Sequence, residues 1–496
     1  MIGALTFVLA LASGWFMVRA VLGPGLRPGW AARAVEAALG CGAGIALSSV
    51  AYFLLLVVHA ASPASVAGVN CVLFGCGVWL AVRARGCEAH AEQPASGGSP
   101  SFRWNWLLAL ALLAGFALVL SGLIGAAKAS PYGEWDAWSI WNLRAKYLAD
   151  PSGGWQSAVS PLLERSHPDY PLLLPGFIAM AWKSAGETPA WVPQAAGFLF
   201  LGLVIALLLG CLALHRSTSS ALLAGFVLLA STSFLYLAPM QYADLPLAFY
   251  FLASIALIVP SSASGVPRGR RLALAGFFAS CAAWTKNEGA VFALLMAACL
   301  LIFEARQNGI RKALASWRPF ALGAAPVLVL VACFALWIAP ASDPLLHQNA
   351  AQLMRKIEDF ARYKQVGQAL FSEAYHFGQP WSHPLLLLAI LAVGLRFRRK
   401  GRYAPALAAS GLVIALVFSV YLGVYIVTPR DLAWHLHTSL ARLYAQLWPG
   451  VVLLFFMLLR TPEETGLPAV TPPLGAKRKI KTRQGNRTAL RIQLQI

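Results

Sequence analysis

Long apolar runs separated by short polar segments dominate the chain. Stretches of 18 or more nearly uncharged residues recur, and each can cross the roughly 30 Å hydrocarbon core of a bilayer as a helix. They do not alternate polar and apolar residues as the strands of an outer-membrane barrel do. The pattern predicts an all-α, polytopic transmembrane helical protein with about 13 crossings. These are approximately 3–22, 36–60, 64–82, 105–127, 189–214, 218–238, 245–260, 271–285, 289–304, 319–340, 383–397, 404–428 and 446–460.

Basic clusters orient these crossings, because Lys and Arg concentrate in loops held on the cytoplasmic side. The clusters are Arg83, Arg85 and Arg103; Arg268, Arg270 and Arg271; Arg306, Arg311, Lys312 and Arg318; Arg396, Arg398, Arg399, Lys400 and Arg402; and the tail from Lys477 to Arg491. We therefore expect a multi-pass protein of the cytoplasmic (inner) membrane with its N-terminus outside. The segment 171–185 is apolar but short, and counting it as a crossing would move every later cluster outside. It is predicted to be a re-entrant or interfacial helix.

Composition agrees with the membrane assignment. The chain is 59% hydrophobic and 12% charged, against about 25% charged residues in soluble domains. A formal charge of +20 would suggest nucleic acid in a soluble protein, but no nucleic-acid-reading motif accompanies it, so membrane lipid is the expected partner. The eight cysteines form no CxxC motif, which argues against a zinc site.

A Pro-, Ser- and Gly-rich stretch at 91–100 is typical of a flexible linker. It suggests three parts: residues 1–104 with three extra N-terminal spans, a core over 105–460 with a large outer loop at 128–170, and a basic cytoplasmic tail over 461–496.

The outer loop begins with two acids, Glu134 and Asp136, interleaved with Trp135, Trp138 and Trp141. The helical spacing of the last two tryptophans predicts an amphipathic helix lying at the interface, with aromatic anchors at headgroup level. The acids are candidate proton acceptors. The alternative is a membrane-surface helix with two solvated carboxylates.

The same loop ends in a proline-rich turn that holds His167 and Asp169. Prolines at 168, 171 and 175 fix φ and discourage helix before the chain re-enters the membrane. An ordered turn is therefore expected here. Alternatively, Asp169 only caps the next helix.

Three further charged side chains are predicted near membrane depth. Asp244 begins a crossing, either as a functional acid or as an N-cap. Lys286 and Glu288 fall between two short apolar stretches. Ionisable groups inside a membrane are costly and point to function, although a structural Lys–Glu pair is the open alternative.

The last predicted outer loop crowds His435, His437 and Arg442 into one short segment. Two histidines at i and i+2 do not share a helix face, so a helical two-histidine metal site is disfavoured. Arg442 suits a phosphate headgroup because a guanidinium makes bidentate contacts. An interfacial arginine that only anchors the helix is the alternative.

The order of these motifs resembles the bacterial GT-C glycosyltransferases, polytopic enzymes akin to protein mannosyltransferases and aminoarabinose transferases. The resemblance covers roughly residues 105–460. It rests on the acidic motif at 134–136, the His-Pro-x-Tyr-Pro turn at 167–171, Ala-Asp-Leu-Pro at 243–246, Thr-Lys at 285–286 and the segment 434–442. Many members carry adjacent acids in the first loop, whereas Trp135 separates them here.

The resemblance implies transfer of a sugar, with inversion, from a polyprenyl-phosphate donor to a glycan, lipid or protein acceptor at the outer face. Asp136 is then the expected general base, with Glu134 orienting it or binding acceptor. Lys286 and Arg442 are expected to bind the donor phosphate. Further substrate-binding candidates are His167, Asp169, Asp244, Glu288 and His435. No cofactor is predicted, and assistance by a divalent metal stays open.

Three other functions compete with this interpretation. A transporter or flippase of a lipid-linked or small polar substrate would use Lys286 and Glu288 in its path, but no internal repeat is visible. A ligase or polymerase of surface polysaccharide is compatible with the long loop at 341–382. A purely structural membrane protein has no need for the Lys286–Glu288 turn.

Overall fold

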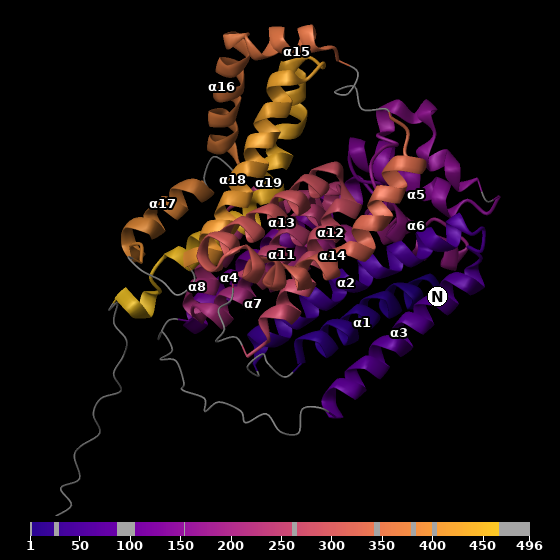
Figure 1. Cartoon of the computed structure of the whole chain (residues 1–496), viewed down its shortest axis with the longest axis horizontal. Helices are drawn as coiled ribbons and strands as arrows, with labels where there is room; N and C mark the ends of the chain where they lie inside the picture. The colour runs from indigo at the N-terminus through magenta and orange to yellow at the C-terminus, as the bar shows by residue number, and fades with distance from the viewer. Residues whose placement is uncertain are drawn as a thin grey trace, which may run out of the picture.

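A computed structural model describes residues 2–23, 29–86, 105–152, 154–259, 265–341, 348–377, 383–398 and 404–465. Over these residues the chain is almost entirely helical, and the only extended pairing is an isolated bridge between Phe397 and Leu459. Figure 1 shows a bundle of long, tilted helices. The helices at 350–376 project from it, beside the ends of the two helices that meet near residue 430. The predicted linker at 91–100 and the basic residues of the tail lie outside the described residues.

Nine helices of the described chain are long and apolar enough to cross a membrane, and this confirms the polytopic α-helical architecture. They are α1 (Ile2–Leu22), α2 (Trp30–Val57), α3 (Pro63–Gly86), α4 (Asn105–Ala129), α7 (Trp191–His215), α13 (Asn287–Asn308), α14 (Ile310–Trp337), α18 (Ala404–Val427) and α19 (Leu432–Leu458).

The predicted count of about 13 crossings is not confirmed, because four predicted crossings are short, basic or bent. α11 (Asp244–Ile258) has 15 residues and α17 (Pro384–Leu395) has 12, too few to cross a full bilayer alone. α12 (Arg268–Thr285) opens with three arginines in its first four residues. The predicted crossing 218–238 is divided between α8 (Thr218–Leu229) and a second arm, α9 (Thr232–Leu235) with α10 (Leu237–Met240), bent by 81°.

The start of the last predicted crossing is wrong. Instead of a loop up to residue 445 followed by a span at 446–460, α19 runs unbroken from Leu432 to Leu458. Leu432, Leu436 and Leu440 recur every fourth residue and are buried, so the helix continues through the polar segment. The predicted loop at 341–382 contains α15 (Ala350–Ile357) and α16 (Phe360–His376), which pack beside the ends of α18 and α19.

α11 is the central helix of the bundle. Every residue from Asp244 to Ile258 is buried, and the helix packs against α12, α19 and α7. A helix that is apolar all round belongs in the interior of a protein. α11 therefore needs no contact with lipid, and its first residue lies inside the bundle.

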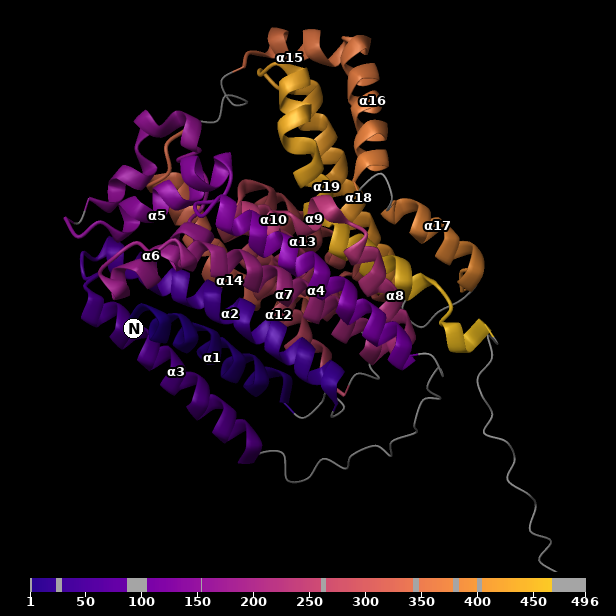
Figure 2. The ribbon, with the colours of Figure 1, turned by 180° about the vertical axis from the view of Figure 1, so that it is seen from behind.

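Residues 130–170, here called the 130–170 segment, follow α4 and lead into a helix that precedes α7. The segment and this helix cover one end of the bundle (Figure 2). Together they contain a π-helical turn (Ala137–Trp141), α5 (Asn142–Ala149), two 3₁₀ turns (Trp155–Val159 and Pro161–Ser166) and then α6 (Leu173–Ala185). The prediction of an interfacial helix with three aromatic anchors is corrected in part. Trp135 and Trp138 are exposed, but Trp141 is buried in the protein core.

Candidate functional site

A cavity of about 1010 Å³ lies at the end of the bundle that carries the 130–170 segment. Its walls come from that segment, the first residues of α11 and α13, the end of α18 and the first half of α19. Eight predicted site residues line it: Asp136, His167, Asp169, Asp244, Lys286, Glu288, His435 and Arg442. The fold thus brings together residues that were predicted on separate loops.

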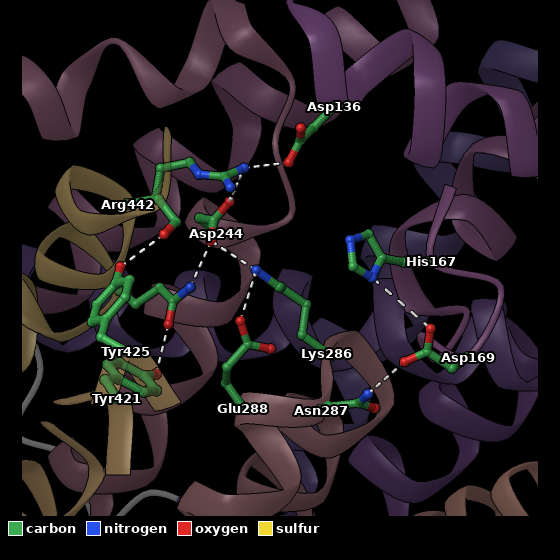
Figure 3. Close-up of polar contacts among 12 residues, drawn as sticks. Asp136, His167, Asp169, Asp244, Lys286, Asn287, Glu288, Tyr421, Tyr425 and Arg442 are labelled. Atoms are coloured by element: carbon green, nitrogen blue, oxygen red, sulfur yellow. Dashed lines mark hydrogen bonds and ion pairs between the residues drawn. The ribbon is translucent and has the colours of Figure 1, made fainter. Parts of the chain in front are cut away.

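Lys286 lies between two carboxylates in the deep part of this cavity (Figure 3). Its Nζ is 3.0 Å from Asp244 Oδ1 and 3.0 Å from Glu288 Oε1. The backbone of Lys286 is extended, with φ −153° and ψ 161°, and this single residue separates the end of α12 from the start of α13. The break between these two helices turns the ammonium group toward the start of α11.

Asp244 does not act as the N-cap of α11. Ala243 occupies the cap position, and no side chain caps the helix. The Asp244 carboxylate, which is only 1% exposed, instead accepts a hydrogen bond from Lys286. Its second oxygen, Oδ2, lies 3.8 Å from Arg442 Nη1. One buried carboxylate therefore faces both cations of the deep cavity.

Arg442 joins the deep cavity to the 130–170 segment. Its Nη1 forms an ion pair with Asp136 Oδ2 and also faces Asp244. The guanidinium carbon lies 5.2 Å from the centre of the Tyr242 ring. The Nε of Arg442 is buried and has no hydrogen-bond partner in the part of the chain that the structure describes. Arg442 therefore links the 130–170 segment to the central helix α11.

Two residues of this network were missed from the sequence. Gln446, one turn after Arg442 on α19, donates from Nε2 to Asp244 Oδ1, and the Tyr421 hydroxyl donates to Gln446 Oε1 at 2.6 Å. Both side chains are buried. The spacing of Arg442 and Gln446 places them on one helix face, but that signal was hidden by the prediction that the helix begins at 446.

A second polar cluster lies on the opposite wall (Figure 3). His167 Nδ1 is 3.9 Å from Asp169 Oδ1, and Asn287 Nδ2 donates to Asp169 Oδ2 at 2.9 Å. Asp169 does not cap α6, whose cap residue is Leu172. The ring of Tyr170 stacks on His167 with centroids 4.6 Å apart, and Lys286 Nζ lies 5.6 Å from its centre. Tyr170 therefore connects the two clusters.

Burial lowers the pKa of the His167 imidazole. The nearby Asp169 carboxylate opposes this shift, whereas the positive charges of Arg430 and Lys286 add to it. The imidazole is therefore neutral at pH 7, since the unperturbed pKa of histidine is about 6.5. In that form one ring nitrogen can donate a hydrogen bond and the other can accept a proton.

Arg144 holds the turn that carries His167. Its side chain is fully buried. It donates to the carbonyl oxygens of Ala158, His167 and Pro168 at 2.9, 3.3 and 3.3 Å. A planar guanidinium with five donors can satisfy several acceptors at once. Arg144 thereby fixes the backbone beside the cavity.

The two remaining predicted site residues, Glu134 and His435, lie in different places relative to the cavity. Glu134 is exposed and does not line the cavity, and its backbone N–H donates to Met240. His435 is half-buried at the cavity wall, with Nδ1 3.0 Å from Thr428 Oγ1. Within the described ranges, no group of three or more His, Cys, Asp or Glu side chains could hold a metal ion.

The arrangement combines carboxylates that can accept a proton with cations that can stabilise an anion, inside a cavity large enough for a sugar and a phosphate. No protein family, curated protein or solved structure matches the chain.

Proposed function

We propose that this chain is an inverting glycosyltransferase that moves a sugar from a polyprenyl-phosphate donor to an acceptor hydroxyl at the outer face of the membrane. The observation that carries the proposal is the position of Arg442. It contacts Asp136 on the 130–170 segment and faces Asp244 on the central helix, within one large cavity. A proton acceptor and a phosphate-binding group thus lie side by side.

The reaction needs both groups. The acceptor oxygen forms a bond to the anomeric carbon as the bond from that carbon to the phosphate oxygen breaks. The electron pair of the broken bond stays on the phosphate, and the hydroxyl proton passes to a carboxylate. Asp136 is our candidate base because it lines the cavity, whereas Glu134 does not. A guanidinium stabilises the charge that develops on the leaving phosphate.

The ion pair suggests how the donor prepares the base. While Arg442 contacts Asp136, its guanidinium occupies Oδ2 of that carboxylate. A donor phosphate would compete for the same guanidinium, whose Nη1 contacts Asp136. Binding of the donor would therefore release Asp136 to accept the proton.

Lys286 has a supporting role in this proposal. Two carboxylates already engage its ammonium group at 3.0 Å, so it has less capacity than Arg442 to bind an added anion. Its charge balances part of the negative charge of Asp244 and Glu288. The walls of the cavity also include Val420, Val424 and Leu443, which suit the first isoprene units of a lipid chain.

The test compares sugar transfer in membrane vesicles that hold wild type or Asp136→Asn, supplied with radiolabelled polyprenyl-phosphate sugars. Label should move to lipid, protein or polysaccharide with wild type and not with the variant. Glu187→Gln neutralises an exposed carboxylate between α6 and α7 and should transfer normally. Full transfer by Asp136→Asn at equal expression would remove Asp136 from the catalytic role.

A transporter or flippase is the second candidate, and the buried charges support it. Asp244, Lys286 and Glu288 lie where α11, α12 and α13 meet, and charges in such positions often mark translocation paths. Sealed vesicles distinguish the two functions. A transporter moves labelled substrate across the membrane and forms no new glycosidic bond.

A further inference from the structure

We propose that the cavity contains a second anion site, separate from Arg442, that binds an acidic group of the acceptor. The site consists of Arg430 and His435 on one wall, and His167 and Arg165 on the other. The inference rests on the proposed transferase function for the identity of its ligand. It assigns the substrate class: an acceptor with a phosphate or carboxylate close to the hydroxyl that receives the sugar.

The distribution of charge inside the cavity is the first argument. In the deep part, the carboxylates of Asp136, Asp244 and Glu288 outnumber the cations Lys286 and Arg442. The deep part therefore carries net negative charge before any ligand binds. It can accept one donor phosphate at Arg442 but offers no spare cation for a second anion.

The outer part has the opposite balance. Arg165 is exposed, Arg430 is half-buried, and both line the cavity. Neither arginine forms an ion pair in the part of the chain that is described here, whereas Arg442 and Lys286 each have two carboxylate neighbours. Among the described residues, Asp169 is the one carboxylate on the outer lining. It accepts a hydrogen bond from Asn287 and lies beside His167.

Arg430 and His435 are held in place by a common hydroxyl. The Thr428 Oγ1 accepts a hydrogen bond from the backbone N–H of Arg430 at 3.3 Å and lies 3.0 Å from His435 Nδ1. The guanidinium of Arg430 packs over the ring of Trp434 at 5.7 Å. The neighbouring Asp431 is the N-cap of α19, and its side chain accepts a hydrogen bond from the backbone N–H of Trp434. The backbone and the guanidinium of Arg430 are thus both held in place, and its charge has no carboxylate partner among the residues that the structure describes.

The opposite wall faces this pair from the 130–170 segment. Arg144 fixes the backbone at His167 through its carbonyl, and Tyr170 stacks on the His167 ring. The positive charge of Arg430 acts on both His167 and His435. All four side chains of the proposed site line the same cavity. Arg165 and Arg430 supply its positive charge there, and the neutral imidazole of His167 can donate a hydrogen bond to an anion.

The spacing argues for two separate anionic groups. His435 and Arg442 are seven residues apart on one helix, which corresponds to about 10 Å along the axis. The two phosphates of one diphosphate are joined through a single oxygen and lie much closer together. The outer cations therefore suit a group on a second molecule. Because they lie at the exposed side of the cavity, we infer that this molecule is the acceptor.

A binding experiment tests the site without any need for transfer. Purified full-length protein in detergent is dialysed to equilibrium against radiolabelled inorganic phosphate. We expect wild type to bind two phosphates per chain. Arg430→Gln should keep only the phosphate at Arg442, and Arg442→Gln should keep only the phosphate at Arg430. Arg355→Gln, which neutralises an exposed arginine of α15, should bind two. The proposal is wrong if Arg430→Gln binds as much phosphate as wild type.

A transfer experiment then identifies the ligand. For acidic acceptors, Arg430→Gln should raise the acceptor KM about tenfold or more, as expected for the loss of a charge-assisted hydrogen bond, while the donor KM stays unchanged. Arg430→Lys keeps the charge and should retain most of the affinity, which guards against a folding defect. Phosphatase treatment of the acceptor should remove the difference between wild type and Arg430→Gln if the group is a phosphate, and carbodiimide blocking should do so if it is a carboxylate.

The two experiments fail in different ways. If wild type transfers no sugar but Arg430→Gln still loses one bound phosphate, the transferase proposal fails and the anion site stands. If wild type transfers sugar but neither phosphate binding nor the acceptor KM depends on Arg430, the second anion site is overturned.

Discussion

Arg442 and Asp136 form an ion pair although 306 positions separate them in the sequence. The pair joins α19 to the 130–170 segment, and both residues line the cavity. Both side chains are about one-fifth exposed, at 21% and 20%, so the pair is shielded from bulk water yet open to a ligand. This combination makes Arg442 the most informative residue to change.

Arg442→Lys should reduce transfer on the order of a hundredfold, because an ammonium cannot contact Asp136 and a phosphate with the planar fork of a guanidinium. Initial rates in vesicles at saturating donor measure the effect. Arg355→Lys is the matched control, since Arg355 is exposed on α15. Equal rates for Arg442→Lys and wild type would show that only the charge at this position matters.

Lys286→Met should destabilise the fold by about 3–5 kcal/mol, because it leaves the buried Asp244 carboxylate without its 3.0 Å partner. The double variant Asp244→Asn with Lys286→Met removes both charges and should recover much of this stability while staying inactive. Thermal unfolding of wild type, the two single variants and the double variant measures the interaction between the two side chains. Additive losses in the double variant would mean that the two side chains do not interact energetically.

Gly289→Ala should both destabilise the protein and reduce activity. A Cβ at Gly289 would lie 1.9 Å from the carbonyl oxygen of Ala282 and 2.2 Å from its carbonyl carbon. α13 must therefore move away from α12, and Lys286 and Glu288 move with it. We expect a loss of about 1–3 kcal/mol by thermal unfolding.

Gly423→Ala is the control for this substitution. Gly423 lies on α18, and a Cβ there meets nothing within 4 Å. Its melting temperature should match wild type or exceed it slightly, since alanine favours helix over glycine. Equal behaviour of the two variants would contradict the close packing of α12 and α13.

Acidification should destabilise wild type through His167. Burial lowers the pKa of His167 in the folded protein, below the value of about 6.5 in an unfolded chain. The folded state then binds this proton less readily than the unfolded state, so the stabilisation is complete above about pH 6.5 and is lost as the pH falls through the folded pKa.

Melting temperatures at about pH 7.5 and about pH 5.5 measure this effect. The drop should be smaller for His167→Gln than for wild type, because the variant cannot take up the proton. His376→Gln, at an exposed histidine of α16, should behave as wild type. An equal drop in all three proteins would assign the pH dependence to other groups.

The sequence pattern predicted the fold class and the long crossings, but not how the shorter helices end. α11 and α17 have the composition of membrane spans but not the length. The polar residues from His435 to Arg442 suggested a loop, yet they form the first turns of α19. Composition alone cannot distinguish a helix surrounded by lipid from one surrounded by other helices, since both are apolar on all faces.

What the sequence by itself determined was the list of costly charges: acids and bases that hydrophobic neighbours would exclude unless something compensates for them. Only the tertiary structure decided which of them meet. The break before α13 places Lys286 against Asp244, and unbroken α19 carries Arg442 to Asp136 and Gln446 to Asp244. The tertiary structure also leaves Glu134 outside the cavity and buries Arg144 beside the turn that carries His167. Such pairings depend on distances between helices far apart in the chain, and local residue patterns carry no record of those distances.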